Sequence, residues 1–409
     1  MNLLELFQGI GSLFAQDPTI AIGRIVLIIL GVVLVLLGFK RVLEPLIMIP
    51  MGFGMTAINA GMLLKAIPVD GAENDLTNIM IAPMESSTEG LMNVMQIDFL
   101  QPIYTLTFSN GLIACIVFMG IGVICDISPV LKYPFTSMLI AMFAELGTIL
   151  TFPIATAMGF SPGEAAAAAI IGTADGPMVL FTSLLLAKDL FVPITIVAYL
   201  YLSICYGFYP ALVKILIPKH LRAKAIQLRE QDSRTISPKA RIIFDVVACA
   251  ALCLLFPVAA PLFLSFFLGN AIREAVMPNY QKLLENVFLY TATFFLGLLL
   301  GILCDVNTFA DPKVLKLLIL GFIALGVAAV GGIIGGYVVY GINKKNYNPT
   351  IGVAGVSCVP TTAKIAQHEV HALDKRVWIL QYAMGANVCG VISSAILTGL
   401  YVTIIPSLM

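Results

Sequence analysis

The sequence predicts an all-α polytopic membrane protein. Of its 409 residues, 59% are hydrophobic and only 11% are Asp, Glu, Lys or Arg, against about 25% charged residues in an average soluble domain. A water-soluble globule of this size needs more polar surface than these side chains supply. The apolar runs are continuous rather than alternating, which favours helices over a membrane β-barrel. With 23 basic and 23 acidic residues the net charge is zero, which excludes electrostatic attraction to nucleic acid.

Ten apolar segments are long enough to cross a hydrocarbon layer of about 30 Å as a helix. They are residues 22–39, 45–64, 104–125, 136–159, 190–217, 242–258, 259–277, 286–304, 314–341 and 377–405. Two further apolar stretches, 163–188 and 349–366, are interrupted by Gly, Pro and polar residues. We expect about ten transmembrane helices, and each interrupted stretch forms a broken or re-entrant hairpin that does not cross.

The two halves of the chain resemble each other. Residues 118–126 (FMGIGVICD) match 296–305 (LGLLLGILCD), and further along 172–177 (GTADGP) match 355–360 (GVSCVP). Each half holds five predicted crossings, an odd number, so the second half must enter the membrane upside down. Many secondary transporters are built from such inverted-topology repeats and bind their substrate near the midplane, where discontinuous segments of both repeats meet.

We therefore predict a first repeat over residues 1–218 and a second over 242–409, joined by a cytoplasmic basic linker, 219–241. Cytoplasmic loops carry an excess of Lys and Arg. If the strongly basic segment 214–241 is cytoplasmic, 18 of the 23 basic residues face the cytoplasm and both termini lie outside. One hairpin then enters from outside and the other from the cytoplasm.

Asp175 is the sharpest candidate for a functional residue. It lies in the first hairpin, between a run of alanines and the helix-breaking Gly176 and Pro177. A charge at that depth costs about 2.5 to 3.5 kcal/mol on insertion scales, so an intramembrane carboxylate points to function. Asp175 either caps the half-helix that follows the break or binds Na⁺ or H⁺.

The second hairpin supplies neutral oxygen donors. They are Asn348, Thr350, Ser357, Thr361 and Thr362. Neutral ligands suit a monovalent cation, because several carboxylates together select a divalent ion or trap protons. Asn387, inside an apolar run, offers either a further ligand oxygen or an interhelical hydrogen bond. Tyr201 lies in the middle of a predicted helix, where its phenol hydroxyl needs a hydrogen-bond partner.

The sequence contains no P-loop, dinucleotide fingerprint or Ser-His-Asp arrangement. Its eight cysteines are scattered through apolar segments and predict no metal or disulfide framework. Transport must therefore draw on an ion gradient or on the chemistry of a partner. The residues alone predict a cation-coupled secondary transporter.

Three polar motifs, in order, resemble one known family. They are GTADGP around Asp175, NPTIGVAGVSCVPTTAK from Asn348 onward and MGANVCGVISSA around Asn387. Together they are similar to the membrane β subunit of the sodium-pumping biotin-dependent decarboxylases, which act on oxaloacetate, methylmalonyl-CoA, glutaconyl-CoA or malonate. The likeness extends over nearly the whole chain.

The resemblance implies a membrane subunit that decarboxylates carboxybiotin from a carrier domain and couples this to Na⁺ export with consumption of a proton. The implied partners are a carboxyltransferase subunit, a biotin carboxyl carrier and a small membrane anchor subunit, with several copies of this chain in the complex. The implied cofactors are Na⁺ and partner-borne carboxybiotin, with no covalent cofactor on this chain and no transition metal. The implied location is a bacterial or archaeal cytoplasmic membrane.

The resemblance also implies roles for individual residues. The sodium-binding set is Asp175, Asn348, Gly352, Ser357 and Asn387, and the catalytic set is Asp175, Tyr201 and Lys364. Tyr201 occupies the place of a proton-relay tyrosine. The family commonly has Arg where Lys364 stands, and Lys keeps the charge but lacks the bidentate fork.

Two other functions remain open at this point. The first is a stand-alone Na⁺- or H⁺-coupled transporter of a small carboxylate, and the second is a membrane anchor without catalysis. Substrate uptake by the purified chain alone distinguishes the transporter, and capture of a biotinylated carrier distinguishes the pump. Loss of activity on substitution of Asp175, with assembly intact, excludes the anchor.

Overall fold

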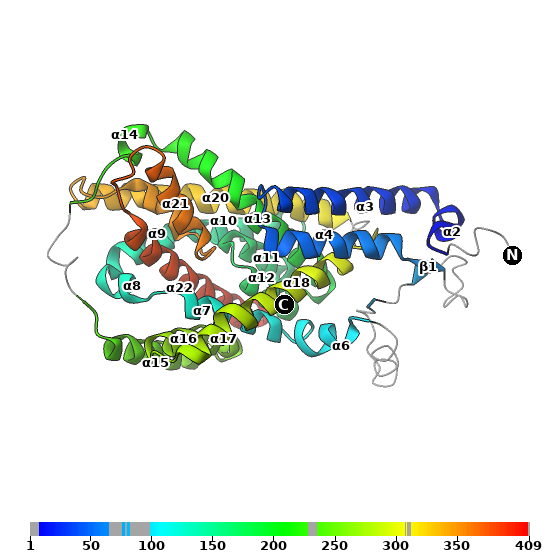
Figure 1. Ribbon diagram of the computed structural model, residues 1–409, viewed down its shortest axis with the longest axis horizontal. Helices are drawn as coiled ribbons and strands as arrows, with labels where there is room; N and C mark the ends of the chain where they lie inside the picture. The colour runs from blue at the N-terminus through cyan, green and yellow to red at the C-terminus, as the bar shows by residue number, and fades with distance from the viewer. Residues whose placement is uncertain are drawn as a thin grey trace. The chain divides into compact units, whose positions relative to one another are not determined.

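The computed structural model describes residues 8–64, 76–77, 80–81, 99–227, 235–306, 308 and 312–407 (Figure 1). Nearly all of these residues are helical, which confirms the all-α class. The chain divides into two compact units. Unit 1 comprises residues 1–113 and 292–314, and unit 2 comprises residues 114–291 and 315–409. Each unit combines residues from both predicted repeats, whose boundaries remain a prediction.

Unit 1 is organised around a pair of packed helices, α3 (Pro18–Phe39) and α4 (Pro45–Ala60). Their backbones approach closely, because a Cβ built on Gly31 would come within 2.7 Å of the carbonyl oxygen of Gly52. The other elements are α2 (Gln8–Ala15), the two-residue strands β1 (Leu63–Leu64) and β2 (Leu76–Thr77), α6 (Gln101–Ile103), the π-helix η1 (Tyr104–Phe108) and most of α18 (Leu289–Leu303). β1 and β2 pair antiparallel.

Unit 2 holds both hairpins and most of the buried core. Its elements are α7 (Leu112–Ile124), α8 (Ser128–Lys132), α9 (Pro134–Ala144), α10 (Leu146–Ala157), α11 (Pro162–Ala169), η2 (Ile170–Thr173), α12 (Gly176–Leu186), η3 (Lys188–Leu190), α13 (Phe191–Leu216), α14 (Lys219–Arg222), α15 (Pro238–Leu255), η5 (Pro257–Ala259), α16 (Ala260–Glu274), α17 (Pro278–Leu283), η6 (Leu284–Phe288), α20 (Pro312–Ile342), η7 (Pro349–Gly355), α21 (Thr361–His371), α22 (Leu380–Ile404) and η8 (Ile405–Ser407).

Proline and capping side chains set where several helices begin. Proline stands in the first turn of α3, where its missing N–H costs nothing, and the Asp17 carboxylate accepts a 2.8 Å hydrogen bond from the backbone N–H of Thr19. At the start of α11, Ser161 and Glu164 form a reciprocal capping box. These local signals set where α3 and α11 begin.

All ten predicted crossings coincide with helices, but they differ in length. Among the described residues, six helices are individually long and apolar enough to cross a membrane, and a seventh span results if the bent pair Gln101–Phe108 and Leu112–Ile124, which meet at 64°, is counted as one. The helices α4, α15 and α16 match the remaining predicted segments and are shorter or more polar. The protein is polytopic, and the figure of ten crossings stays a prediction.

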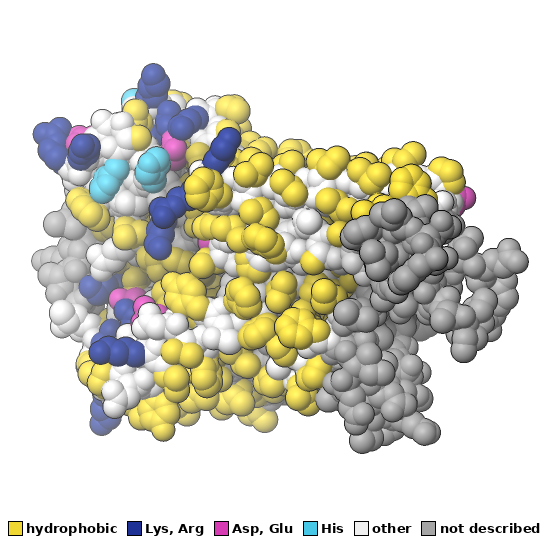
Figure 2. Space-filling model, turned by 45° about the vertical axis from the view of Figure 1, so that its right-hand side comes forward, with side chains coloured by type: hydrophobic (Ala, Val, Ile, Leu, Met, Phe, Trp, Pro, Cys, Tyr) yellow, Lys and Arg dark blue, Asp and Glu magenta, His cyan; other side chains and the backbone are white. Residues whose placement is uncertain are grey.

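The surface is consistent with lipid as solvent. Exposed large hydrophobic side chains are concentrated on helices such as α3 and α15, where Ile22, Ile29 and Leu254 are 62%, 57% and 85% exposed. Figure 2 shows hydrophobic side chains over much of the visible face, with Lys, Arg and His gathered on one part of it. This segregation is what a membrane-embedded surface requires.

The predicted internal similarity has structural counterparts in both units. A short α-helix and a π-helix precede α7 and again precede α18. In unit 1, the Asn59 amide donates 2.8 Å to the carbonyl oxygen of Cys304. In unit 2, the Asn270 amide donates 2.6 Å to the carbonyl oxygen of Cys125. Each cysteine belongs to one of the matched Cys-Asp pairs, and the repeat itself stays a prediction.

The glycines of residues 331–336 bring α20 against the second hairpin. A Cβ on Gly332 would come within 2.5 Å of the carbonyl oxygen of Gly352, and one on Gly336 would overlap the carbonyl oxygen of Pro349. Small residues permit this close backbone packing in membrane proteins. The hairpin is therefore held against α20 by direct backbone contact.

We expect Gly332→Ala to lower the free energy of unfolding by about 1–3 kcal/mol, because the new methyl group meets backbone that cannot rotate away. The measurement is the thermal midpoint of the purified protein in detergent. The matched control is Gly326→Ala on the same helix, where nothing lies within 4 Å of the new Cβ. Equal midpoints for the two variants would contradict the packing described here.

Candidate functional site

Both predicted hairpins are broken in the middle. In the first, α11 and η2 lead to Ala174, which has a left-handed φ of 55°, and the extended residue Asp175 precedes α12. In the second, the 3₁₀-helix η7 ends at Gly355 and α21 begins at Thr361. Each break leaves backbone polar groups that the helices themselves cannot satisfy.

The two breaks lie in contact. The backbone N–H of Ser357 donates 3.2 Å to the carbonyl oxygen of Thr173, and the Ser357 hydroxyl donates 2.6 Å to the same oxygen. Ser357 is 3% exposed and Thr173 is 2% exposed. Residues 184 positions apart in the chain are thereby joined inside the protein.

Asp175 lies beside this contact and is 4% exposed. Its backbone N–H donates 3.1 Å to the Thr173 hydroxyl, and its Oδ2 accepts a long, 3.5 Å hydrogen bond from the Ser394 hydroxyl on α22. Its Oδ1 has no hydrogen-bond partner among the residues that the structure describes. Asp175 occupies the N-cap position of α12, but its side chain makes no capping hydrogen bond there. The carboxylate thus lies at the N-terminal end of α12 with Oδ1 left over for a ligand.

Asn387 organises the second break from α22. Its amide nitrogen donates to the carbonyl oxygens of Ala354 and Val356, at 3.1 and 2.9 Å, and to the Thr362 hydroxyl at 3.0 Å. The side chain is fully buried. Its oxygen, Oδ1, has no partner in the described part of the chain. Asn387 therefore fills the interhelical role and still offers an oxygen to a ligand.

Glu145 is a second buried carboxylate that sequence reasoning missed. It stands at the junction of α9 and α10, is 5% exposed, and accepts hydrogen bonds from Ser393 at 2.9 Å and Thr148 at 3.1 Å. Because Ser393 and Ser394 are adjacent on α22, one turn of this helix contacts both Glu145 and Asp175. The missed signal was an acidic residue within the apolar segment 136–159, which is unusual at membrane depth.

Two tyrosines of α13 lie in different environments. The ring of Tyr199 packs on Gly176, where a Cβ would come within 2.6 Å of the phenolic oxygen, so Tyr199 lies at the start of α12 beside Asp175. The hydroxyl of Tyr201, the candidate proton relay, donates to the carbonyl oxygen of Leu318 in α20. The structure therefore places Tyr199, which the sequence analysis did not select, nearer to the buried carboxylate.

Three other predicted site residues lie around the second hairpin. The amide nitrogen of Asn348 donates 2.9 and 2.8 Å to the carbonyl oxygens of Arg222 and Lys224, and its oxygen accepts from the backbone N–H of Thr350. Gly352 contacts α20 so closely that it has no room for a side chain. Lys364 is exposed on α21. Asn348 and Gly352 thus hold the hairpin in place, whereas Lys364 is not part of the buried set.

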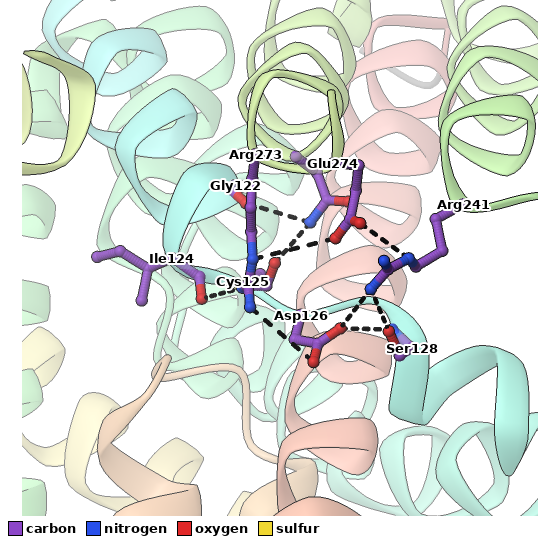
Figure 3. Close-up of polar contacts among 9 residues, drawn as sticks. Gly122, Ile124, Cys125, Asp126, Ser128, Arg241, Arg273 and Glu274 are labelled. Carbon is purple, nitrogen blue, oxygen red and sulfur yellow. Dashed lines mark hydrogen bonds and ion pairs between the residues drawn. The ribbon is translucent and has the colours of Figure 1, made fainter. Parts of the chain in front are cut away.

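A charged cluster closes the end of α7 (Figure 3). Arg241 Nε lies 2.8 Å from Glu274 Oε2, and Arg273 donates 2.7 Å to the carbonyl oxygen of Ile124. Both arginines lie 3.9 Å from Asp126 oxygens. Asp126 also accepts a 2.8 Å hydrogen bond from the backbone N–H of Ser128, at the start of α8. These contacts pair Arg241 and Arg273 with Glu274 and Asp126.

Further ion pairs lie on α21 and in the segment after it. Buried Glu369 lies 3.4 Å from Arg222, and Arg376 lies 2.9 Å from Asp374. The hydrogen bonds from Arg376 hold the pKa of the Asp374 carboxyl below its ordinary value. Across the described ranges, no group of three or more His, Cys, Asp or Glu side chains is arranged to hold a metal ion.

The fold and this site define a class of protein. Broken helices that meet inside a polytopic helical protein, around a buried carboxylate and uncharged oxygens, are the arrangement of ion-coupled membrane transporters.

Comparison with known proteins gives the family. Residues 23–405 match the family described as Na+-transporting oxaloacetate decarboxylase beta subunit. The chain is 54% identical over 402 residues to the carboxybiotin decarboxylase of Malonomonas rubra, covering 98% of each chain. It is 30% identical to the oxaloacetate decarboxylase beta chain of Haemophilus ducreyi, covering 100% of each, and 30% identical to the methylmalonyl-CoA decarboxylase beta subunit of Propionigenium modestum, covering 93% and 95%. The chain belongs to this family of decarboxylase β subunits.

We expect Asn387→Leu to lower the free energy of unfolding by about 1–3 kcal/mol, because buried carbonyl oxygens of the second break lose their hydrogen-bond donor. The thermal midpoint in detergent measures this change. Asn279→Leu, an exposed amide on α17, is the matched control and is expected to stay within about 0.5 kcal/mol of the unsubstituted protein. If Asn387→Leu behaves like the control, the amide does not support the break.

Proposed function

We propose that this chain is the membrane subunit that decarboxylates carboxybiotin delivered by a carrier domain, and that it couples this reaction to Na⁺ export with consumption of a proton. The observation that carries the proposal is Asp175, a buried carboxylate with an unpartnered oxygen among the described residues, at the contact of two broken hairpins. The name of the relative from Malonomonas rubra, carboxybiotin decarboxylase, supports the reaction.

The reaction requires one proton for each CO₂ released. The bond between a ureido nitrogen of biotin and the carboxyl carbon breaks, and the electron pair stays on the nitrogen. That nitrogen takes up the proton while CO₂ departs. The chain must therefore bring a proton to the biotin nitrogen, and we assign this relay to Tyr201 and Asp175, with Lys364 on the same hairpin as Ser357 contributing a positive charge.

We propose that Na⁺ is bound where the two hairpins meet. The unpartnered oxygens of Asp175 and Asn387 and the hydroxyl of Ser357 are ligands of the kind that a hard monovalent cation takes. Asn348 and Gly352 complete the proposed set by holding the second hairpin in register. Moving one Na⁺ outward against a membrane potential of about 100 mV costs about 2.3 kcal/mol. The free energy released by decarboxylation must cover this cost, so CO₂ release must be coupled to Na⁺ movement.

The proposed partners follow from the substrate. Carboxybiotin is attached to a carrier, so the chain works with a biotin carboxyl carrier and with a carboxyltransferase that loads it. We further propose a small membrane anchor subunit and more than one copy of this chain in the complex, in a bacterial or archaeal cytoplasmic membrane. Relatives named as beta chains or beta subunits of decarboxylases support a multisubunit assembly.

We expect Asp175→Asn to reduce both Na⁺-dependent decarboxylation and sodium uptake into inverted vesicles at least about 100-fold, a loss of about 2.7 kcal/mol, because the neutral amide cannot balance the cation. Radioactive sodium uptake and CO₂ release from N-carboxybiotin are the measurements. The control is Asp189→Asn, an exposed carboxylate before α13. Retained pumping by Asp175→Asn, or uptake of a small carboxylate by the chain alone without decarboxylation, would contradict the proposal.

Glu145→Gln is expected to raise the Na⁺ concentration for half-maximal decarboxylation about tenfold, which corresponds to about 1.4 kcal/mol. The physical reason is that Glu145 and Asp175 both accept hydrogen bonds from one turn of α22, so the Glu145 charge favours a cation at Asp175. A sodium titration of the rate measures the effect, again against Asp189→Asn. An unchanged sodium titration would assign Glu145 a purely structural role.

A further inference from the structure

Unit 1 contains a fully buried arginine that lies outside the proposed sodium site. Arg24 stands in the second turn of α3, and none of its surface is exposed. A guanidinium group keeps its positive charge in proteins, so the cost of burying it cannot be relieved by loss of a proton. Buried charges are normally paired with an opposite charge. The positive charge of Arg24 therefore requires a negative partner.

The hydrogen bonds that Arg24 makes are all to neutral oxygens. Its Nε donates 2.9 Å to the carbonyl oxygen of Asn59. Its Nη1 donates to the Ser12 hydroxyl at 3.0 Å and to the Gln16 side-chain oxygen at 3.1 Å. Within the described ranges, no Asp or Glu forms an ion pair with this guanidinium group. These contacts orient Arg24 without neutralising its charge.

Two hydrogen-bond donors of this cluster are unused. Arg24 Nη2 and Gln16 Nε2 are buried and have no hydrogen-bond partner in the part of the chain that the structure describes. The bond between Arg24 Nη1 and Gln16 Oε1 brings the two nitrogens into one neighbourhood, because each nitrogen shares a carbon with an atom of that bond. Two N–H donors beside a fixed positive charge suit an acceptor that is itself negatively charged.

The cluster lies where three helices of unit 1 meet. Gln16 directly follows α2, Arg24 belongs to α3 and Asn59 belongs to the last turn of α4. The Ser12 hydroxyl, which accepts from Arg24, also donates 3.0 Å to the carbonyl oxygen of Met62. The predicted orientation places this end of α3 toward the outside of the membrane. A ligand held by Arg24 and Gln16 therefore stabilises the junction of α2, α3 and α4.

We propose that Arg24 and Gln16 bind a small monovalent anion from the external medium. One buried positive charge is neutralised by one negative charge, so a divalent anion such as sulfate would leave a buried excess charge. Asn59 Oδ1 is an acceptor that also has no partner among the described residues. An anion that carries a proton, as bicarbonate does, can donate to it, whereas chloride cannot. Chloride and bicarbonate are therefore the two probes.

The first test measures the thermal midpoint of the full chain in detergent while chloride replaces gluconate at constant sodium concentration and ionic strength. A ligand that binds only the folded state raises the midpoint as its concentration increases. We expect a saturating rise of about 2–4 °C. A parallel series with bicarbonate shows which of the two anions binds more tightly. Absence of a rise with both anions overturns the proposal.

Gln16→Glu is the sharpest variant, because it places a carboxylate of the chain beside Arg24 in place of the anion. We expect its midpoint in gluconate to match that of the unsubstituted protein with the anion, and the anion to cause no further rise. Arg24→Gln is expected to lose the response, and Lys40→Gln, an exposed cation at the other end of α3, to keep it. A full anion response in Gln16→Glu overturns the proposal, even if Arg24→Gln does not fold.

Equilibrium dialysis measures binding directly and does not depend on decarboxylation. The probe is radiolabelled chloride or bicarbonate, whichever raises the midpoint more. We expect about one ion per chain in the unsubstituted protein and in Lys40→Gln. Binding to Gln16→Glu is expected to be at least about tenfold weaker, which corresponds to about 1.4 kcal/mol. Equal binding by Gln16→Glu and the unsubstituted protein overturns the assignment.

Discussion

A break in a helix inside a membrane exposes backbone polar groups where no water can satisfy them, and in this protein the two breaks satisfy each other. The carbonyl oxygen of Thr173 at the end of η2 receives both the backbone N–H and the hydroxyl of Ser357. On the other side, the Asn387 amide satisfies the carbonyl oxygens of Ala354 and Val356. Hydrogen bonds that the two broken helices cannot form are thereby replaced by contacts close to the breaks. The side-chain oxygens of Asp175 and Asn387 that accept no hydrogen bond from the described residues are available to a ligand.

This contact requires unusually close packing of backbone against backbone. Five consecutive alanines of α11, Ala165–Ala169, are fully buried, and the glycines of α20 lie against η7 with no space for a Cβ. Gly390 of α22 approaches the carbonyl oxygen of Gly355 in the same way. Small side chains let backbones approach closely and gain dispersion energy, since lipid supplies no hydrophobic force between helices. The small residues of these segments are therefore what holds the site together.

Two buried carboxylates next to such a contact are costly unless a cation or proton accompanies them. The adjacent Ser393 and Ser394 of α22 donate hydrogen bonds to Glu145 and Asp175, so both acids lie against the same turn of this helix. The start of the same helix carries Tyr382, which lines a cavity of unit 2. α22 therefore contacts both broken hairpins and the junction of α9 and α10.

Local patterns in the sequence determined much of the fold and part of the site. Apolar run length determined the helical segments, and the Gly and Pro of the interrupted stretches determined both breaks, because helix length and helix breaking depend on neighbouring residues alone. Asp175, Ser357 and Asn387 were recognisable as polar groups at membrane depth. Only the tertiary structure decided that Glu145 joins them, that Tyr199 rather than Tyr201 lies beside Asp175, and that Lys364 is exposed. These outcomes depend on how distant helices rotate and pack against one another, which no local pattern encodes.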